Sequence, residues 1–237
     1  MQVTIKKYDP TKDAEPYNKT YEVPWKKHMT VLEAIMYVHE NHEPVGFDYS
    51  CRGRVCGRCS MMVNGEPAMA CFTHIKNQAN TLEPLRGFPV IRDFIVDKSK
   101  THYAMGRILN RIIEKPITDR EKILAPMDPE LYKKINGIEW CCRCLSCQAA
   151  CPVINEKKDQ EKFIGPAGIV STALRYYDPF DEGDRVTEAV QNGLFECIMC
   201  GRCNKACPAD EIDHLKIYAE LRKAAKDRGL KPKPRKA

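Results

Sequence analysis

No stretch of this 237-residue sequence is long and uncharged enough to cross a bilayer. No run without a charged residue is longer than that over residues 163–174, which is well short of the roughly 20 residues that a membrane-spanning helix needs. The first residues alternate like a strand and contain neither an apolar signal region nor twin arginines. We therefore expect a cytosolic chain, in which clustered cysteines bind metal more often than they form disulfides.

The usual signatures of substrate chemistry are also missing. No glycine-rich dinucleotide fingerprint follows a strand, and the sequence has no P-loop and no nucleophile elbow. The six histidines are scattered without the spacing of metal ligands, and no isolated pair of carboxylates suggests acid-base work. We assign no catalytic residue to this chain.

The net charge of +6 would suggest a nucleic-acid partner if it were spread over the chain. It is concentrated in residues 226–237, which hold six basic residues against the single acid Asp227. This tail has no aromatic residue and so lacks the stacking platform of single-strand binders. We predict no nucleic-acid partner and a surface tail, with an anionic membrane surface or a partner subunit as the alternatives.

What the sequence has in excess is cysteine, with 13 residues in two sets separated by 69 residues that contain none. The part around the first set alternates like strands near Val3 and Tyr21, with a helix after Thr30 and a hairpin turn at Asn64-Gly65. The second part has helical spacing over residues 101–114, 128–135, 166–176, 185–191 and 211–227. The fold class is therefore α+β, with a mixed-sheet domain over residues 1–105 and a helical domain over residues 106–237.

The first set of cysteines has the spacing of plant-type [2Fe-2S] ferredoxins, in which one loop and a distant strand supply the ligands. Its members are Cys51, Cys56, Cys59 and Cys71. Gly53 and Gly57 let the loop curl so that backbone N–H groups point inward, and three arginines offset the cluster charge. A four-cysteine zinc site is the alternative, but zinc sites usually come as two C-x2-C pairs.

The second set contains two bacterial-ferredoxin runs, each C-x2-C-x2-C-x3-C-P. In two-cluster ferredoxins the last cysteine of each run binds the other cluster. The predicted ligands are Cys141, Cys144, Cys147 and Cys207 for a [4Fe-4S] cluster, and Cys197, Cys200, Cys203 and Cys151 for a third cluster. Cys142 fits neither run and is predicted to be a small buried side chain. We expect Trp140 to shield the neighbouring cluster from water.

This arrangement resembles the iron-sulfur subunit of succinate dehydrogenase and fumarate reductase, the complex II family. The resemblance rests on the order of several motifs along nearly the whole chain. They are Ser50-Cys51-Arg52, Cys56-Gly57, Asn64-Gly65, Ala70-Cys71, Pro89-Val90-Ile91-Arg92-Asp93, Phe163-Ile164-Gly165-Pro166-Ala167 and Arg175-Tyr176. The resemblance implies a plant-type ferredoxin (β-grasp) domain followed by an all-α bacterial-ferredoxin-like domain.

The same resemblance implies a function. In this family a flavoprotein with FAD interconverts succinate and fumarate, and a membrane anchor, often with haem, binds quinone. The iron-sulfur subunit relays electrons between them, in the tricarboxylic acid cycle or in anaerobic respiration. We therefore expect a peripheral subunit of a bacterial inner-membrane complex, held at the cytoplasmic face by its anchor.

Two positions depart from the family pattern. Typical members have no cysteine where this chain has Cys200, and their third cluster is [3Fe-4S]; a thiolate there favours [4Fe-4S]. In members whose quinone site borders this subunit, a Trp follows the second run and a His follows the first cysteine of the third. Here these positions are Glu156 and Ile198, so no quinone-binding residue is assigned to this chain.

Two other functions stay open. One is the iron-sulfur subunit of a flavoenzyme that passes electrons from thiols or another donor to fumarate, although such relatives usually carry further cysteine-rich modules after the helical half. The other is a soluble multi-cluster ferredoxin, although such carriers are commonly small and acidic.

Overall fold

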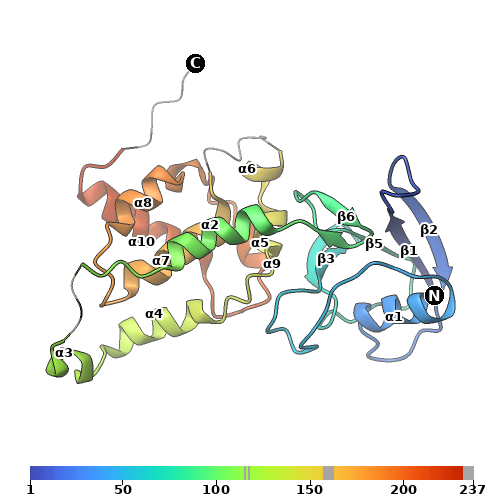
Figure 1. Cartoon of the computed structure of the whole chain (residues 1–237), viewed down its shortest axis with the longest axis horizontal. Helices are drawn as coiled ribbons and strands as arrows, with labels where there is room; N and C mark the ends of the chain where they lie inside the picture. The colour runs from blue at the N-terminus through green and yellow to red at the C-terminus, as the bar shows by residue number, and fades with distance from the viewer. Residues whose placement is uncertain (115, 117, 157–162, 232–237) are drawn as a thin grey trace, which may run out of the picture.

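The computed structural model describes residues 1–114, 116, 118–156 and 163–231. Figure 1 shows a β-rich part and a helical part side by side, with helix α2 (Ser99–Leu109) running from the first along the second. This is the predicted α+β fold. None of the helices in the described ranges has both the length and the hydropathy to span a membrane. The last residues of the basic tail, 232–237, lie outside the described residues.

The β-rich part is a five-stranded mixed sheet with one helix packed on it. The strand order is β2-β1-β5-β3-β4, in which β1 and β5 are parallel and the other neighbours antiparallel. The strands are β1 (Gln2–Lys7), β2 (Tyr17–Glu22), β3 (Ser60–Val63), β4 (Glu66–Met69) and β5 (Asn80–Glu83). Val3 and Ile5 of β1 are fully buried in the same core as Ile35 of α1 (Val31–Asn41). A ribbon of β6 (Val90–Arg92) and β7 (Ile95–Val96) follows the sheet.

Two local predictions for this part are confirmed. Thr30 caps α1 in a capping box, because its hydroxyl accepts the Glu33 N–H at 3.2 Å and the Glu33 carboxylate accepts the Thr30 N–H at 2.7 Å. The β3–β4 hairpin turns through Asn64 and Gly65, both with the positive φ that a two-residue turn of this type requires. Cys71 lies two residues beyond the end of β4.

The helical part packs around α7 (Gly165–Tyr177), in which residues 165–173 are all buried. Helices α2 and α4 (Pro129–Glu139) lie against α7, and α10 (His214–Asp227) closes the core through the fully buried Tyr218 and Leu221. The remaining helices of the described residues are α3 (Arg120–Leu124), α5 (Ser146–Ala150), α6 (Pro152–Asn155), α8 (Arg185–Gln191) and α9 (Arg202–Ala206), with a 3-10 turn η1 (Leu194–Glu196).

Some helix ends differ from the predicted ones. The helix predicted over 101–114 ends at Leu109, because Asn110 is extended. The helix predicted from 211 begins at His214, where the Asp213 carboxylate caps it by accepting the Lys216 N–H at 3.1 Å. The predicted domain boundary near residue 105 falls inside α2 and stays a prediction.

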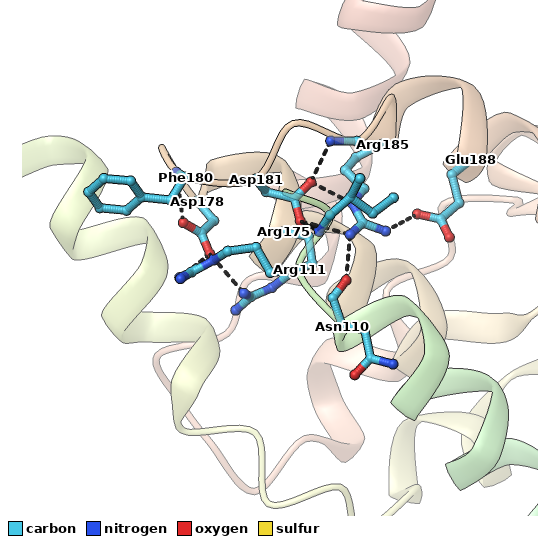
Figure 2. Close-up of polar contacts among 10 residues, drawn as sticks. Asn110, Arg111, Arg175, Asp178, Phe180, Asp181, Arg185 and Glu188 are labelled. Carbon is cyan, nitrogen blue, oxygen red and sulfur yellow. Dashed lines mark hydrogen bonds and ion pairs between the residues drawn. The ribbon is translucent and has the colours of Figure 1, made fainter. Parts of the chain in front are cut away.

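A buried ionic network ties the end of α2 to the loop between α7 and α8 (Figure 2). Arg185 donates to both carboxylate oxygens of Asp181 at 2.8 and 2.7 Å and to the carbonyl of Asn110 at 2.7 Å. Beside it, Asp178 accepts from Arg111 at 2.8 Å and from Arg175 at 2.7 Å. The network fixes the segment that leaves α2 onto the helical core.

Candidate iron-sulfur sites

The first three cysteines of the first set lie on the loop between α1 and β3, and Cys71 follows β4. The Cys51 sulfur accepts the backbone N–H groups of Gly53, Val55 and Cys56, each at 3.3 Å. These hydrogen bonds, led by that from Gly53, lower the pKa of the Cys51 thiol to about 6. The loop therefore stabilises a thiolate before any metal is present, and a thiolate is the form that binds iron.

The four thiols of this set fall into two pairs. Cys51 interacts with the Cys56 thiol, and the Cys71 N–H points to the Cys59 sulfur at 3.5 Å. Burial raises the pKa of Cys59 to about 12. Cys59 and Cys71 are both buried, whereas Cys51 is exposed to solvent. Two thiol pairs are what the two irons of a [2Fe-2S] cluster need, one pair for each iron.

The curl of this loop comes from left-handed backbone at Arg52, Arg54 and Gly57. The two arginine side chains turn outward, and their guanidinium groups lie over the Tyr49 and Phe72 rings at 5.2 and 4.8 Å. Their charges thus stay at the rim of the loop while the N–H groups face the sulfur.

The two later runs share one backbone design. Arg143 and Leu145 have positive φ in the second run, and Met199 and Gly201 have it at the matching positions of the third. In each run the N–H of the first of these residues donates to the first cysteine: Arg143 to Cys141 and Met199 to Cys197. A short helix follows, α5 in one run and α9 in the other.

The prediction exchanges the last cysteines of the two runs, and the structure places each exchanged cysteine near the other run. One pocket is lined by Cys141, Cys144, Cys147 and Cys207, by the unassigned Cys142, and by apolar side chains of α7 and of the segment before α10. Cys151 interacts electrostatically with Cys197 and Cys200, and so does Cys203. Burial raises the pKa of Cys203 and of Cys207 to about 12. Which cysteine binds which iron stays a prediction.

Several features of the chain fit clusters at these places. All 13 cysteines are free of disulfides. Within the described residues, no three His, Cys, Asp or Glu side chains converge on a point that one ion could fill. Tyr218 is fully buried and interacts electrostatically with Cys197, Cys203, Cys151 and Cys147. Its hydroxyl has no hydrogen-bond partner among the described residues, so a cluster sulfur would supply the acceptor that it lacks.

Two expectations about neighbouring residues are wrong. Trp140 is 55% exposed, because it ends α4 at the surface, and it cannot shield a cluster from water. Cys142 is half-buried and lines the large cavity between the two parts. Its side chain shares a hydrogen bond with Cys144, which raises the pKa of Cys142 and lowers that of Cys144 to about 6.

The contact between the two parts was not predicted. Gly57 of the first loop packs directly on the backbone of the second run, so closely that a Cβ atom there would lie 2.2 Å from the Cys142 carbonyl oxygen and 2.9 Å from the Cys144 nitrogen. The spacing of the cysteines within each set carries no information about this contact, since the two segments are far apart in sequence.

Fold and thiol groups together define an iron-sulfur protein that carries a plant-type ferredoxin module and a two-cluster module. Residues 2–103 match the family of 2Fe-2S iron-sulfur cluster binding domains, and residues 137–210 match the family of 4Fe-4S dicluster domains. The structure resembles the Mycobacterium smegmatis Sdh1 complex in the apo form, with a TM-score of 0.80 and 26% identity over 96% of this chain and 95% of that one.

The fumarate reductase iron-sulfur subunit of Haemophilus influenzae is 31% identical over 88% of this chain and 86% of that protein. This chain therefore belongs to the fumarate reductase and succinate dehydrogenase family of iron-sulfur subunits. Two archaeal relatives are longer. The chain covers 44% of a fumarate reductase (CoM/CoB) subunit of Methanothermobacter marburgensis, at 30% identity, and 41% of an uncharacterized iron-sulfur protein of Methanocaldococcus jannaschii, at 35% identity. The chain thus spans less than half the length of these two.

Proposed function

We propose that this chain relays electrons between an FAD flavoprotein that acts on succinate or fumarate and a quinone-binding membrane anchor with haem. The observation that carries this proposal is the contact of Gly57 with the Cys142 and Cys144 backbone, because it sets the first thiol group directly against the second. The crossed positions of Cys151 and Cys207 join the second group to the third in the same way. When bound, each cluster accepts and donates one electron at a time.

Both ends of this series are exposed, and each can face a different neighbour. The surface around the first thiol group is exposed, with Val55 of the cysteine loop at 69% and Phe72, which follows Cys71, at 58%, and we place the flavoprotein there. At the other end Cys200 is exposed, and we place the anchor there, with the chain peripheral at the cytoplasmic face of the membrane.

A second function has support of its own. The relative from Methanothermobacter marburgensis is named a fumarate reductase (CoM/CoB) subunit and matches 92% of this chain. In that case the electrons would come from a thiol donor instead of a quinol, and the same three thiol groups would carry them to the flavoprotein. A soluble ferredoxin is the third possibility, and it predicts no fixed flavoprotein partner.

Purification of the affinity-tagged chain from detergent-solubilised membranes of its own cells separates these functions. We expect a flavin-containing subunit and an anchor with quinone to copurify, and the complex to couple succinate and fumarate to a quinone analogue. Copurification of a flavoprotein in a complex that reduces fumarate with electrons from thiols and not from quinols would support the second function. Recovery of the chain alone, loaded with clusters, would contradict both.

We further propose that Cys200 makes the third cluster [4Fe-4S]. The matched backbone of the two runs supports this, because Cys200 holds in the third run the position that Cys144 holds in the second. Each of these two cysteines lies between two residues with positive φ. An equivalent backbone presents the thiol of each to its own site. The difference is that Cys144 is buried and Cys200 is exposed.

Replacing Cys200 with alanine should convert the third cluster to [3Fe-4S], since one iron loses its only protein ligand. The expected result is one iron fewer per chain and a new electron paramagnetic resonance signal of [3Fe-4S] in the oxidised, anaerobically purified complex. Cys142→Ala is the matched control and should leave the iron content unchanged. A [3Fe-4S] signal of the same size in the unaltered complex would refute the role of Cys200.

A further inference from the structure

A short polar chain crosses the junction between the first two thiol groups. Lys98, just before α2, donates from Nζ to the hydroxyl of Ser60 at 2.7 Å, and Ser60 donates to the carbonyl oxygen of Cys144 at 2.8 Å. Ser60 follows Cys59 at the start of β3 and is buried, as is Cys144. The ammonium group of Lys98 is thereby held beside the first thiol group and, through one hydroxyl, beside the second.

We infer that Lys98 is a positioning residue for electron transfer, whose charge raises the reduction potentials of the first and second clusters together. This inference rests on the proposed relay, since it requires clusters in both thiol groups. Reduction adds negative charge to a cluster, and a nearby cation stabilises the reduced form more than the oxidised form. Because the Ser60 hydroxyl fixes the ammonium group between the two sites, one side chain acts on both.

The surroundings leave this charge largely uncancelled. The strongest electrostatic partners of Lys98 are the thiols of Cys144, Cys59 and Cys142 and the carboxylate of Asp48. Asp48 is exposed and paired with Arg58 at 3.4 Å, so its charge is shared and screened. Burial lowers the pKa of Lys98 and the neighbouring anions oppose this; two anionic clusters would add to the groups that favour the ammonium form.

The position of Lys98 also predicts which clusters change their reduction potential when this residue is replaced. A unit charge acting over about 10 Å at an effective dielectric constant of about 20 changes an equilibrium roughly tenfold. No cysteine of the third group is among these strongest partners of Lys98. The third cluster is therefore an internal reference, whose potential should not respond to a change at this position.

The test is the replacement Lys98→Met in the intact complex, with each cluster titrated by electron paramagnetic resonance. We expect the one-electron reduction of the first and second clusters to become roughly tenfold less favourable, which corresponds to about 59 mV for each, while the third cluster keeps its potential. Lys98→Arg should keep all three potentials close to those of the unaltered complex. Lys100→Met, which removes an exposed lysine two residues away, is the matched control and should change none.

The outcomes separate this inference from the relay itself. Potentials of the first two clusters that stay unchanged in Lys98→Met, with full iron content, would overturn the role of Lys98 and leave the relay intact. Equal shifts at all three clusters would also overturn it, because they would indicate a general structural change. Absence of the first cluster from the unaltered complex would refute the relay. If Lys98→Met assembles without clusters, Lys98→Gln, which keeps a donor for Ser60, serves the same titration.

Discussion

Replacement of Arg185 with leucine should lower the free energy of opening of the helical part by about 3–5 kcal/mol, the usual cost of removing one partner of a buried ion pair. The side chain of Arg185 is 4% exposed and that of Asp181 is 0% exposed. Leucine fills part of the space but leaves the Asp181 carboxylate without a cation. The Asp181 carboxylate would then accept only from neutral donors, which are the N–H groups of Gly183 at 3.0 Å and Ile112 at 3.1 Å.

The loss should reach α2 because Arg185 joins three segments. Besides Asp181, it binds Glu188 of α8 at 2.7 Å and the carbonyl of Asn110 at 2.7 Å (Figure 2). In the leucine variant the Asn110 carbonyl also loses a buried donor. We therefore expect the end of α2 to detach together with the α7–α8 loop, and the cluster ligands of the helical part to become easier to strip of iron.

Hydrogen-deuterium exchange of the cluster-loaded protein measures this effect, since global unfolding of a chain with bound clusters is not two-state. The amides of α7 and α8 should open with a free energy about 3–5 kcal/mol lower than in the unaltered protein. Lys223→Ala, which breaks an exposed ion pair with Asp227, is the control and should cost at most about 0.5 kcal/mol. A loss below about 1 kcal/mol for Arg185→Leu would mean that solvent or a rearranged side chain satisfies Asp181.

The local features of this fold could be predicted because each is specified by neighbouring residues. Thr30 and Glu33 define the start of α1, and Asn64-Gly65 defines the hairpin, through contacts within three residues. The helix predicted over 185–191 from its helical spacing has the observed ends, and Asp184 caps it by accepting the Thr187 N–H. The cysteine runs likewise encode their loops in spacing alone.

Features set by contacts between distant segments were not predicted. Helices of four or five residues such as α5 and α9 show no periodicity, and they form because left-handed residues at Leu145 and Gly201 redirect the chain after a cysteine. The exposure of Trp140 depends on where α4 ends, not on its neighbour Cys141. Nothing in the sequence distinguishes Lys98 and Ser60 from ordinary surface and strand residues, and only the packing of one part on the other brings them to the junction.

Gly57 is the residue at that junction with the least tolerance for change. Its φ of +69° favours glycine, and alanine there costs about 1–2 kcal/mol in backbone strain alone. The added Cβ would also lie 2.2 Å from the Cys142 carbonyl oxygen and 3.0 Å from the Cys144 Cα. Both are backbone atoms of a loop that holds cluster ligands, so relief requires the two loops to separate, at about 1–3 kcal/mol more.

We expect Gly57→Ala to retain the first cluster and to weaken the magnetic coupling between the reduced first and second clusters, because the loops that hold them move apart. Two control variants isolate the cause. Gly65→Ala has a similar positive φ but nothing within 4 Å of the new atom, and Gly53→Ala, in the same loop as Gly57, meets only the Cys51 carbonyl oxygen at 3.6 Å. Gly65→Ala adds backbone strain without a collision, and Gly53→Ala adds a methyl group without that strain. Both variants should leave the magnetic coupling intact. If Gly65→Ala or Gly53→Ala weakened it as much as Gly57→Ala, the effect would not arise from contact between the loops, and the direct path between the first two clusters would lose its support.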